Sequence, residues 1–178
     1  MKRLLLSLIA LPLLVSACTD SPTATTVNLG KTTLATFLEN VGYRAWYDPG
    51  YATYPIADDQ AAFDAAVAII AARLNAGEGN FRAIMVTKPN CGCQHTQREM
   101  PKIMKTLDAA GFPQENIDVW ITDTRLAGID ELTDVHAMDV APTFLIEQNG
   151  VELGRIEIRD DATDNADIST DLATIFSQ

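Results

Sequence analysis

The chain has 178 residues, of which 47% are hydrophobic and 21% are charged, so one domain with a buried core is expected and global disorder is excluded. Its formal net charge of −11 argues against nucleic-acid binding, because sequence-independent binding requires a basic surface. Ten Gly and eight Pro residues are too few for a fibrous or low-complexity protein.

The first 17 residues resemble a secretory signal peptide rather than part of the fold. A short basic start precedes an apolar run from Leu4 to Val15, which is shorter than the roughly 20 residues of a membrane-spanning helix. The run ends in Ser16-Ala17-Cys18, and small residues before a cysteine resemble the cleavage box of bacterial lipoproteins. In such proteins the cysteine receives lipid, such as palmitate, and becomes the new N-terminus. An ordinary signal peptide cut near Ala17 is the alternative.

A lipid on Cys18 would place the protein in the cell envelope, facing the periplasm. Residues 18–30 contain many Ser and Thr and predict a flexible tether. Thr19, rather than Asp, follows Cys18, and bacterial lipoproteins of this type usually move to the outer membrane. We therefore expect a membrane anchor through Cys18, with the acyl chains rather than the acidic body holding the protein to lipid.

Residues 31–57 predict a helical and aromatic extension. Apolar residues at helical spacing indicate a short helix from Lys31 to Val41. The segment from Tyr43 to Tyr54 holds all four tyrosines, with a turn expected at Pro49-Gly50. This aromatic segment is interpreted as cover for a sheet edge or an apolar face; the alternative is a partner-binding groove near Cys93.

Strands and helices alternate through residues 58–178. Asp58 is expected to cap a helix that runs to about Asn75, and the nearly continuous apolar run of residues 81–87 predicts a buried central strand. The remaining expected elements are a helix from about Cys93 to Gly111, strand 117–122, helix 126–136, strands 143–147 and 151–158 joined through Asn149-Gly150, and a final helix from Ile168. This order predicts an α/β domain with a mixed central sheet flanked by helices on both faces.

Three features of residues 58–178 together resemble the thioredoxin family. Strand 83–86 leads to Cys93 at a strand-to-helix turn, and Pro101 follows eight residues later, where the family helix has its kinking proline. The segment 140–145, followed by Asn149-Gly150, resembles the family's cis-proline segment and hairpin. The resemblance implies a thioredoxin-like fold.

The spacing between cysteine and proline fixes the register of this resemblance. Cys93 takes the position of the first active-site cysteine, and the second falls on Thr96. Thr87 occupies the position of the family's buried acid. The stretch from Cys93 to Pro101 is therefore a one-cysteine variant, Cys-x-x-Thr, and is also similar to thioredoxin-like proteins with Cys-x-x-Ser and Arg-Glu-x-Pro.

The thiols Cys91 and Cys93 are candidates for redox chemistry. A disulfide across one intervening residue closes a small strained ring, which is more easily reduced than a structural staple. A thiol at a helix N-terminus favours the thiolate, so Cys93 is the expected nucleophile and Cys91 the expected resolver. Protonated His95 and the hydroxyl of Thr96 would stabilise that thiolate. The predicted function is thiol–disulfide exchange, with thiols or disulfides of periplasmic proteins as partners.

The resemblance also implies a substrate-binding role for Ala141, Pro142 and Thr143. A cis Ala141-Pro142 bond would lie beside Cys93 and would offer backbone pairing to an extended peptide, although it could also serve only as a tight start to the strand. His136 is interpreted as an ordinary residue.

Two other functions remain open at this point. Cys91, Cys93 and His95 form a Cys-x-Cys-x-His pattern of soft ligands that could hold Cu(I) or zinc. The domain could instead be a redox-inactive binding module. The composition indicates no nucleotide, flavin or haem, so no cofactor is expected.

Overall fold

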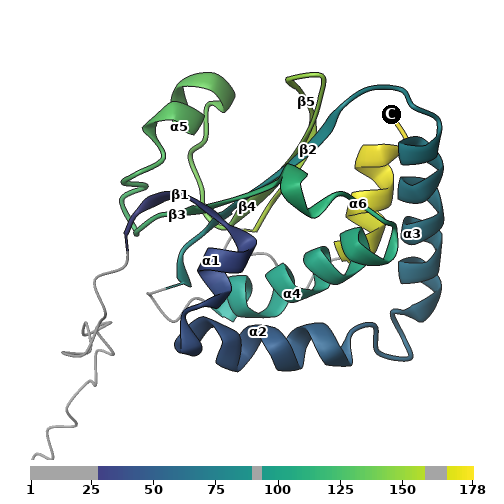
Figure 1. Cartoon of the computed structure of the whole chain (residues 1–178), viewed down its shortest axis with the longest axis horizontal. Coiled ribbons are helices and arrows are strands. Elements are labelled where there is room, and N and C mark those ends of the chain that lie inside the picture. Colours follow the sequence, from purple (N-terminus) through teal and green to yellow (C-terminus); the bar gives the residue numbers. More distant parts are fainter. Residues whose placement is uncertain (1–27, 90–93, 159–167) are drawn as a thin grey trace, which may run out of the picture.

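A computed structural model of the chain describes residues 28–89, 94–158 and 168–178 (Figure 1). The expected signal peptide, Cys18, Cys91 and Cys93 lie outside these residues. Within the three described ranges, no helix has the length and apolar character needed to cross a membrane.

A five-stranded mixed sheet forms the centre of the molecule, with strand order β1-β3-β2-β4-β5. The central strand β2 pairs in parallel with β3 and antiparallel with β4, while β1 pairs antiparallel with β3 and β5 antiparallel with β4. The predicted mixed sheet is therefore confirmed. The strands are β1 (Gly30–Thr33), β2 (Phe81–Thr87), β3 (Ile117–Ile121), β4 (Thr143–Gln148) and β5 (Val151–Glu157).

Helices cover both faces of the sheet, as predicted (Figure 1). Helix α5 lies on one face, and α1, α4 and α6 lie on the other, with α2 packed on α4 and α3 packed on α6. The order of helices and strands after residue 57 is also confirmed. The helices are α1 (Leu34–Leu38), α2 (Val41–Thr53), α3 (Gln60–Asn75), α4 (Gln94–Ala109), α5 (Asp130–His136) and α6 (Ile168–Phe176).

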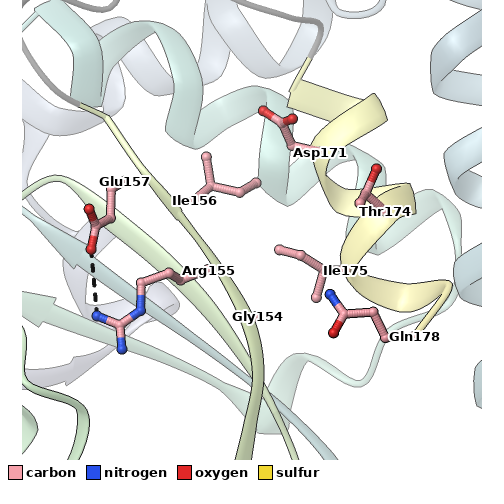
Figure 2. Close-up of a pocket in the computed structure, with 8 residues that line it drawn as sticks. All are labelled: Gly154, Arg155, Ile156, Glu157, Asp171, Thr174, Ile175 and Gln178. Carbon is pink, nitrogen blue, oxygen red and sulfur yellow. Dashed lines mark ion pairs between the residues drawn. The ribbon is translucent and has the colours of Figure 1, made fainter.

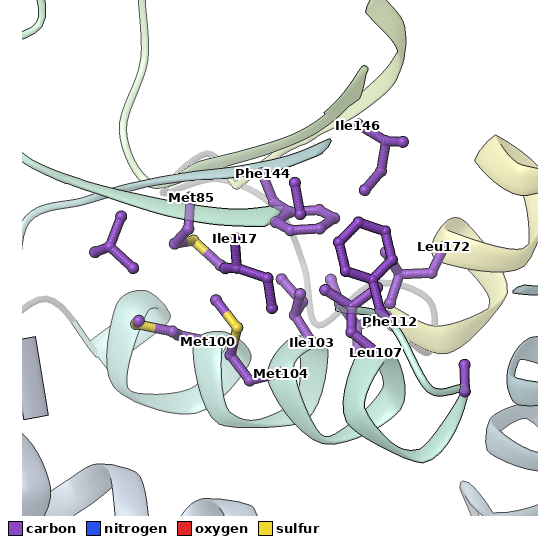
Figure 3. Packing of buried hydrophobic residues seen from close by; sticks show 14 of the residues in the cluster. Met85, Met100, Ile103, Met104, Leu107, Phe112, Ile117, Phe144, Ile146 and Leu172 are labelled. Atoms are coloured by element: carbon purple, nitrogen blue, oxygen red, sulfur yellow. The ribbon is translucent and has the colours of Figure 1, made fainter. Parts of the chain in front are cut away.

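The central strand β2 is apolar and buried from Ala83 to Val86, as expected of a strand that is covered on both faces. Successive strand side chains point to opposite faces, so Met85 packs toward α4 while Ile84 packs toward α5. The larger core lies between the sheet and α4, where Met100, Ile103 and Met104 meet the strand side chains (Figure 3). The middle of β2 is therefore held by packing on both faces of the sheet.

The predicted helix from Lys31 to Val41 is wrong. Residues Gly30–Thr33 form β1, an edge strand paired with β3, and only Leu34–Leu38 form a helix. The side chain of Thr33 accepts a hydrogen bond from the Thr36 backbone N–H, so it caps this helix and ends the strand. Val41, which is 80% exposed, instead starts α2.

The predicted turn at Pro49-Gly50 is also wrong, because α2 continues through both residues. The Oδ1 atom of Asn40 accepts hydrogen bonds from the Gly42 and Tyr43 backbone N–H groups and caps the helix. Tyr43 and Tyr47 are buried one helical turn apart, which confirms that the aromatic segment covers an apolar face. The apolar face that it covers lies on the helices rather than on the sheet, since α2 packs on α4.

Two helix starts differ in detail from their predictions. Asp59, rather than Asp58, precedes α3, and its side chain makes no capping hydrogen bond. Helix α5 begins at Asp130 rather than at Leu126, because Oδ1 of Asp123 accepts the backbone N–H groups of Arg125 and Ala127 and holds a turn there.

Candidate functional site

The candidate site is built around the junction between β2 and α4. Thr87 ends β2, and Thr96 lies in the first turn of α4. Both side chains are buried, and the hydroxyl of Thr87 donates a hydrogen bond to Oγ1 of Thr96 over 3.2 Å. This contact ties the first turn of α4 to the end of the central strand.

The start of β4 lies beside the same end of β2. Thr143 pairs with Val86, so Pro142 is next to the strand position of Thr87. The predicted cis peptide bond between Ala141 and Pro142 is confirmed. The two segments that the sequence predicted to form the site, around Thr96 and around Pro142, therefore meet at Thr87.

The backbone around Pro142 is already partly paired inside the domain. The Pro142 carbonyl accepts the Ile158 backbone N–H over 3.1 Å, and Thr143 lies between β2 and β5. The hydroxyl of Thr143 donates to the Val140 carbonyl over 2.9 Å. Of the three predicted substrate-binding residues, Ala141 is thus the one outside these strand pairings.

The remaining predicted residues of the site lie on or before α4. His95 is partly buried in the first turn of the helix, next to Thr96. Pro101 is buried inside α4, as its position in the motif predicts, and Glu99 contacts Arg98 and lies 3.4 Å from the Lys102 ammonium. Cys91 and Cys93 lie outside the described residues, so their geometry and their pairing stay predictions.

A metal site at this position stays a prediction for the same reason. Among the residues that the structure describes, no three His, Cys, Asp or Glu side chains are grouped so that they could hold a metal ion. The predicted soft-ligand set combines His95 with Cys91 and Cys93, which are not among them.

Two open pockets lie away from this junction. An open pocket of about 360 Å³ lies between β5 and α6 and includes Arg155, Glu157 and Asp171 (Figure 2). Another, of about 670 Å³, lies over Arg82 and Asp118 at the opposite end of the sheet from Thr87. Among the predicted site residues that the structure describes, none lines either pocket, so neither pocket is treated as the candidate site.

One cluster of buried titratable side chains was not predicted from the sequence. His136, interpreted as ordinary, is buried at the end of α5 between two carboxylates, Glu147 on β4 and Glu152 on β5. Glu147 is a charged residue next to the apolar run 144–146, and an inward-facing charge in such a strand is a signal that a partner exists. Nothing in the local sequence identified that partner.

Comparisons with known proteins assign the chain to no family. No family model matches it, and no curated protein does. Among solved structures, an HIV epitope-scaffold protein is 19% identical, covering 76% of this chain and 93% of the other, with a TM-score of 0.37. A Pseudomonas aeruginosa protein of unknown function is 18% identical, covering 76% and 92%, with a TM-score of 0.37. The described residues form a mixed α/β fold with a five-stranded sheet.

Proposed function

We propose that this chain is a thioredoxin-like thiol–disulfide oxidoreductase of the cell envelope, with Cys93 as its nucleophile. The observation that carries the proposal is the buried hydrogen bond between Thr87 and Thr96. In the register set by Cys93 and Pro101, these residues take the positions of the family's buried acid and second cysteine. Their contact supports that register, because the motif requires the two positions to be neighbours.

The arrangement of the elements supports the same proposal. The β2–α4 junction, the proline inside α4 and the β4–β5 hairpin occur in the predicted order, with Pro142 beside the end of β2. Helix α4, which has 16 residues, begins at Gln94, so Cys93 directly precedes its N-terminal turn in the sequence. The unpaired N–H groups and the dipole of such a turn favour the thiolate form.

Thr96 has a defined role in this proposal. Its hydroxyl oxygen accepts the hydrogen bond from Thr87, so the Thr96 hydroxyl group can still donate a hydrogen bond of its own. We infer that Thr96 donates it to the Cys93 thiolate. Protonated His95, in the same turn, would add a positive charge.

The reaction proceeds in two exchange steps. The Cys93 thiolate attacks one sulfur of a partner disulfide, so that a mixed disulfide forms and the other partner sulfur leaves as a thiolate. The Cys91 thiolate then attacks the Cys93 sulfur, which releases the second partner thiolate and leaves a Cys91–Cys93 disulfide. Two electrons pass to the partner in this direction, and the reverse sequence oxidises a partner dithiol. The backbone at Ala141 would hold the partner peptide.

The proposed location of the protein is the cell envelope. Lipid attached to Cys18 would hold the domain at the periplasmic side of the outer membrane, with residues 19–28 as a Ser- and Thr-rich tether. The partners would be thiols or disulfides of periplasmic proteins.

A redox titration of the full chain in detergent tests the proposal, with the two thiols read by alkylation and intact mass. We expect Cys91 and Cys93 to oxidise together in one two-electron transition within the range of the periplasm. Two thiols that never pair would contradict the role of Cys91 as resolver. If metal is bound to those thiols after purification without chelator, the metal-binding function replaces this one.

A pair of variants tests the order of the two steps. Cys91→Ser should accumulate mixed disulfides through Cys93, because the resolving thiolate is absent. Cys93→Ser, the matched control, should form none. Unchanged turnover in Cys91→Ser would show that Cys91 does not resolve the intermediate.

A further inference from the structure

The side chain of His136 is held between two carboxylates on different strands. Its Nε2 atom lies 2.9 Å from Oε1 of Glu147 on β4, and its Nδ1 atom lies 3.0 Å from Oε2 of Glu152 on β5. The His136 side chain is only 5% exposed and that of Glu147 is 7% exposed. We call these three residues the histidine clasp.

The clasp requires a particular protonation state. An ionised carboxylate only accepts hydrogen bonds, and a neutral imidazole has one N–H and one acceptor nitrogen. Both ring nitrogens of His136 face carboxylate oxygens, so both can be bonded to ionised partners only if both carry protons. The guanidinium of Arg155 contacts Glu152 over 2.6 Å, which favours the ionised form of that carboxylate. The geometry therefore fits an imidazolium.

The clasp joins a larger set of charged groups. Arg82 from β2 lies 3.4 Å from Glu147 and also contacts Asp118 on β3, and the Lys31 ammonium on β1 lies 3.0 Å from Asp118. Ion pairs thus connect all five strands through one face of the sheet. His136 directly contacts Glu147 from β4 and Glu152 and Arg155 from β5. Arg82 contacts Glu147, and Glu157 and Asp139 interact with Arg155. Helix α5 itself also carries the carboxylates Asp130, Glu131 and Asp134.

The clasp also fixes the segment that leads to the candidate site. His136 is the last residue of α5, and its carbonyl accepts a hydrogen bond from Arg155 over 2.7 Å. Ala137 follows in the left-handed conformation, with φ of 49°, and begins the segment 137–142. The other end of this segment is held by Thr143 and Ile158. The position of Ala141 therefore depends on how firmly His136 is held.

We propose that His136 is a proton-dependent positioning residue, which as an imidazolium joins α5 to the β4–β5 hairpin and fixes the start of the segment 137–142. Loss of one ring proton leaves a lone pair facing a carboxylate, so one of the two bonds breaks and the segment loosens. This structural statement stands on the clasp alone. Its consequence, slower disulfide exchange as the clasp opens, rests on the proposed function.

Two NMR measurements on the full chain in detergent test the inference. We expect the His136 ring to carry two N–H groups at neutral pH. We expect its proton loss at higher pH to speed amide exchange at Ile158, whose N–H donates to the Pro142 carbonyl, and at the buried residues Met138 and Ala141, by about tenfold beyond the base-catalysed rate. In His136→Gln the exchange at these amides should be fast at every pH. His95→Gln, the same change at the chain's other histidine, should leave the pH dependence of exchange at these amides unchanged. The ring signals that remain in this variant belong to His136.

The outcomes separate this inference from a merely structural role. A folded chain in which the His136 ring is neutral at neutral pH would overturn it, as would exchange that does not follow the ring proton. If His136→Gln does not fold, Glu152→Gln keeps the ring and weakens one partner, and it should speed exchange at the same amides by a smaller factor. A chain without disulfide-exchange activity would contradict the proposed function, and the NMR result would still decide the clasp.

Discussion

Gly50 on α2 lies directly against the ring of Pro101 on α4. A Cβ atom at position 50 would lie 3.0 Å from both Cβ and Cγ of that proline, which is closer than ordinary van der Waals contact. The sequence predicted a turn at Gly50 and a helix kink at Pro101. In the structure the two residues form one contact between α2 and α4. Because α4 begins at the candidate site, this contact helps to hold in place the helix that carries Thr96.

Adding a methyl group at this contact should destabilise the protein. Gly50→Ala improves helix propensity by about 1 kcal/mol, but overpacking against a rigid ring typically costs about 1–3 kcal/mol. We expect a net loss of about 1 kcal/mol in the free energy of unfolding, measured by urea denaturation. In a Pro101→Ala background the cost should shrink, because the ring carbon Cγ is gone; an equal cost in both backgrounds would show that the ring is not the obstacle.

The hydrogen bond between Thr87 and Thr96 should show strong coupling. Thr96→Val leaves the fully buried Thr87 hydroxyl without the acceptor it uses, which costs about 1–3 kcal/mol. The double variant with Thr87→Val removes both partners, so its cost should be less than the sum of the two single costs. Urea denaturation of the four chains measures this, with Thr124→Val at an exposed turn as the control. Additive costs would contradict the bond.

The same variants separate stability from reactivity at the proposed nucleophile. Thr96→Val removes the proposed donor to the Cys93 thiolate, so alkylation of Cys93 near neutral pH should slow. Thr87→Val keeps that donor and should slow alkylation less, although it removes the same hydrogen bond. Equal rates in both variants would argue that Thr96 does not touch the thiolate.

The sequence predicted the central elements well because their signals are local. Residues 83–86 are apolar on both strand faces, and the Asn149-Gly150 pair, with φ of 56° and 78°, makes a tight hairpin turn. The edge strand β1 was missed because its partner, β3, lies far along the chain, and the helical spacing of Leu34 and Phe37 extended the predicted helix over it. Local periodicity carries no information on such pairings.

The candidate site was predictable to the same extent. The motif identified Thr87, Thr96 and Pro142 individually, and the fold was needed to bring them to one end of β2. The histidine clasp could not be found in the same way, because its three members come from three elements and only their packing makes them partners. A lone histidine in a sequence gives no indication of the charges it will meet.

Glu152 should contribute to the resistance of the fold to acid. Burial raises the pKa of its carboxyl, but the hydrogen bonds from Arg155 and then His136 outweigh it and hold that pKa below the ordinary value of 4.5. A carboxyl with a lowered pKa stabilises the fold above its unfolded pKa, and this contribution is lost as the pH falls through the folded pKa. Glu152→Gln should therefore lower the free energy of unfolding at pH 7 and have much less effect in acid below the folded pKa.

Urea denaturation at a series of pH values measures this difference. Glu131→Gln, an exposed change of the same kind on α5, is the matched control and should shift stability little at any pH. A Glu152→Gln deficit that stays constant into strong acid would contradict the pairing with Arg155 and His136, because a protonated carboxyl no longer accepts these charge-assisted bonds.

Tyr51 should titrate well above a free tyrosine. Burial, and then the hydrogen bond that its hydroxyl donates to Asp108 on α4, raise the pKa of Tyr51 from 10.0 to about 12. A raised pKa favours the neutral phenol in the folded chain, so the stability it contributes is complete below pH 10 and is lost as the pH rises toward 12. Asp108→Asn keeps an acceptor and removes the negative charge, and it should lower the pKa of Tyr51 toward 10. Ultraviolet titration of phenolate formation measures the change, and Tyr51→Phe identifies which of the four tyrosines it belongs to; a curve that Asp108→Asn leaves unmoved would show that Asp108 does not set this pKa.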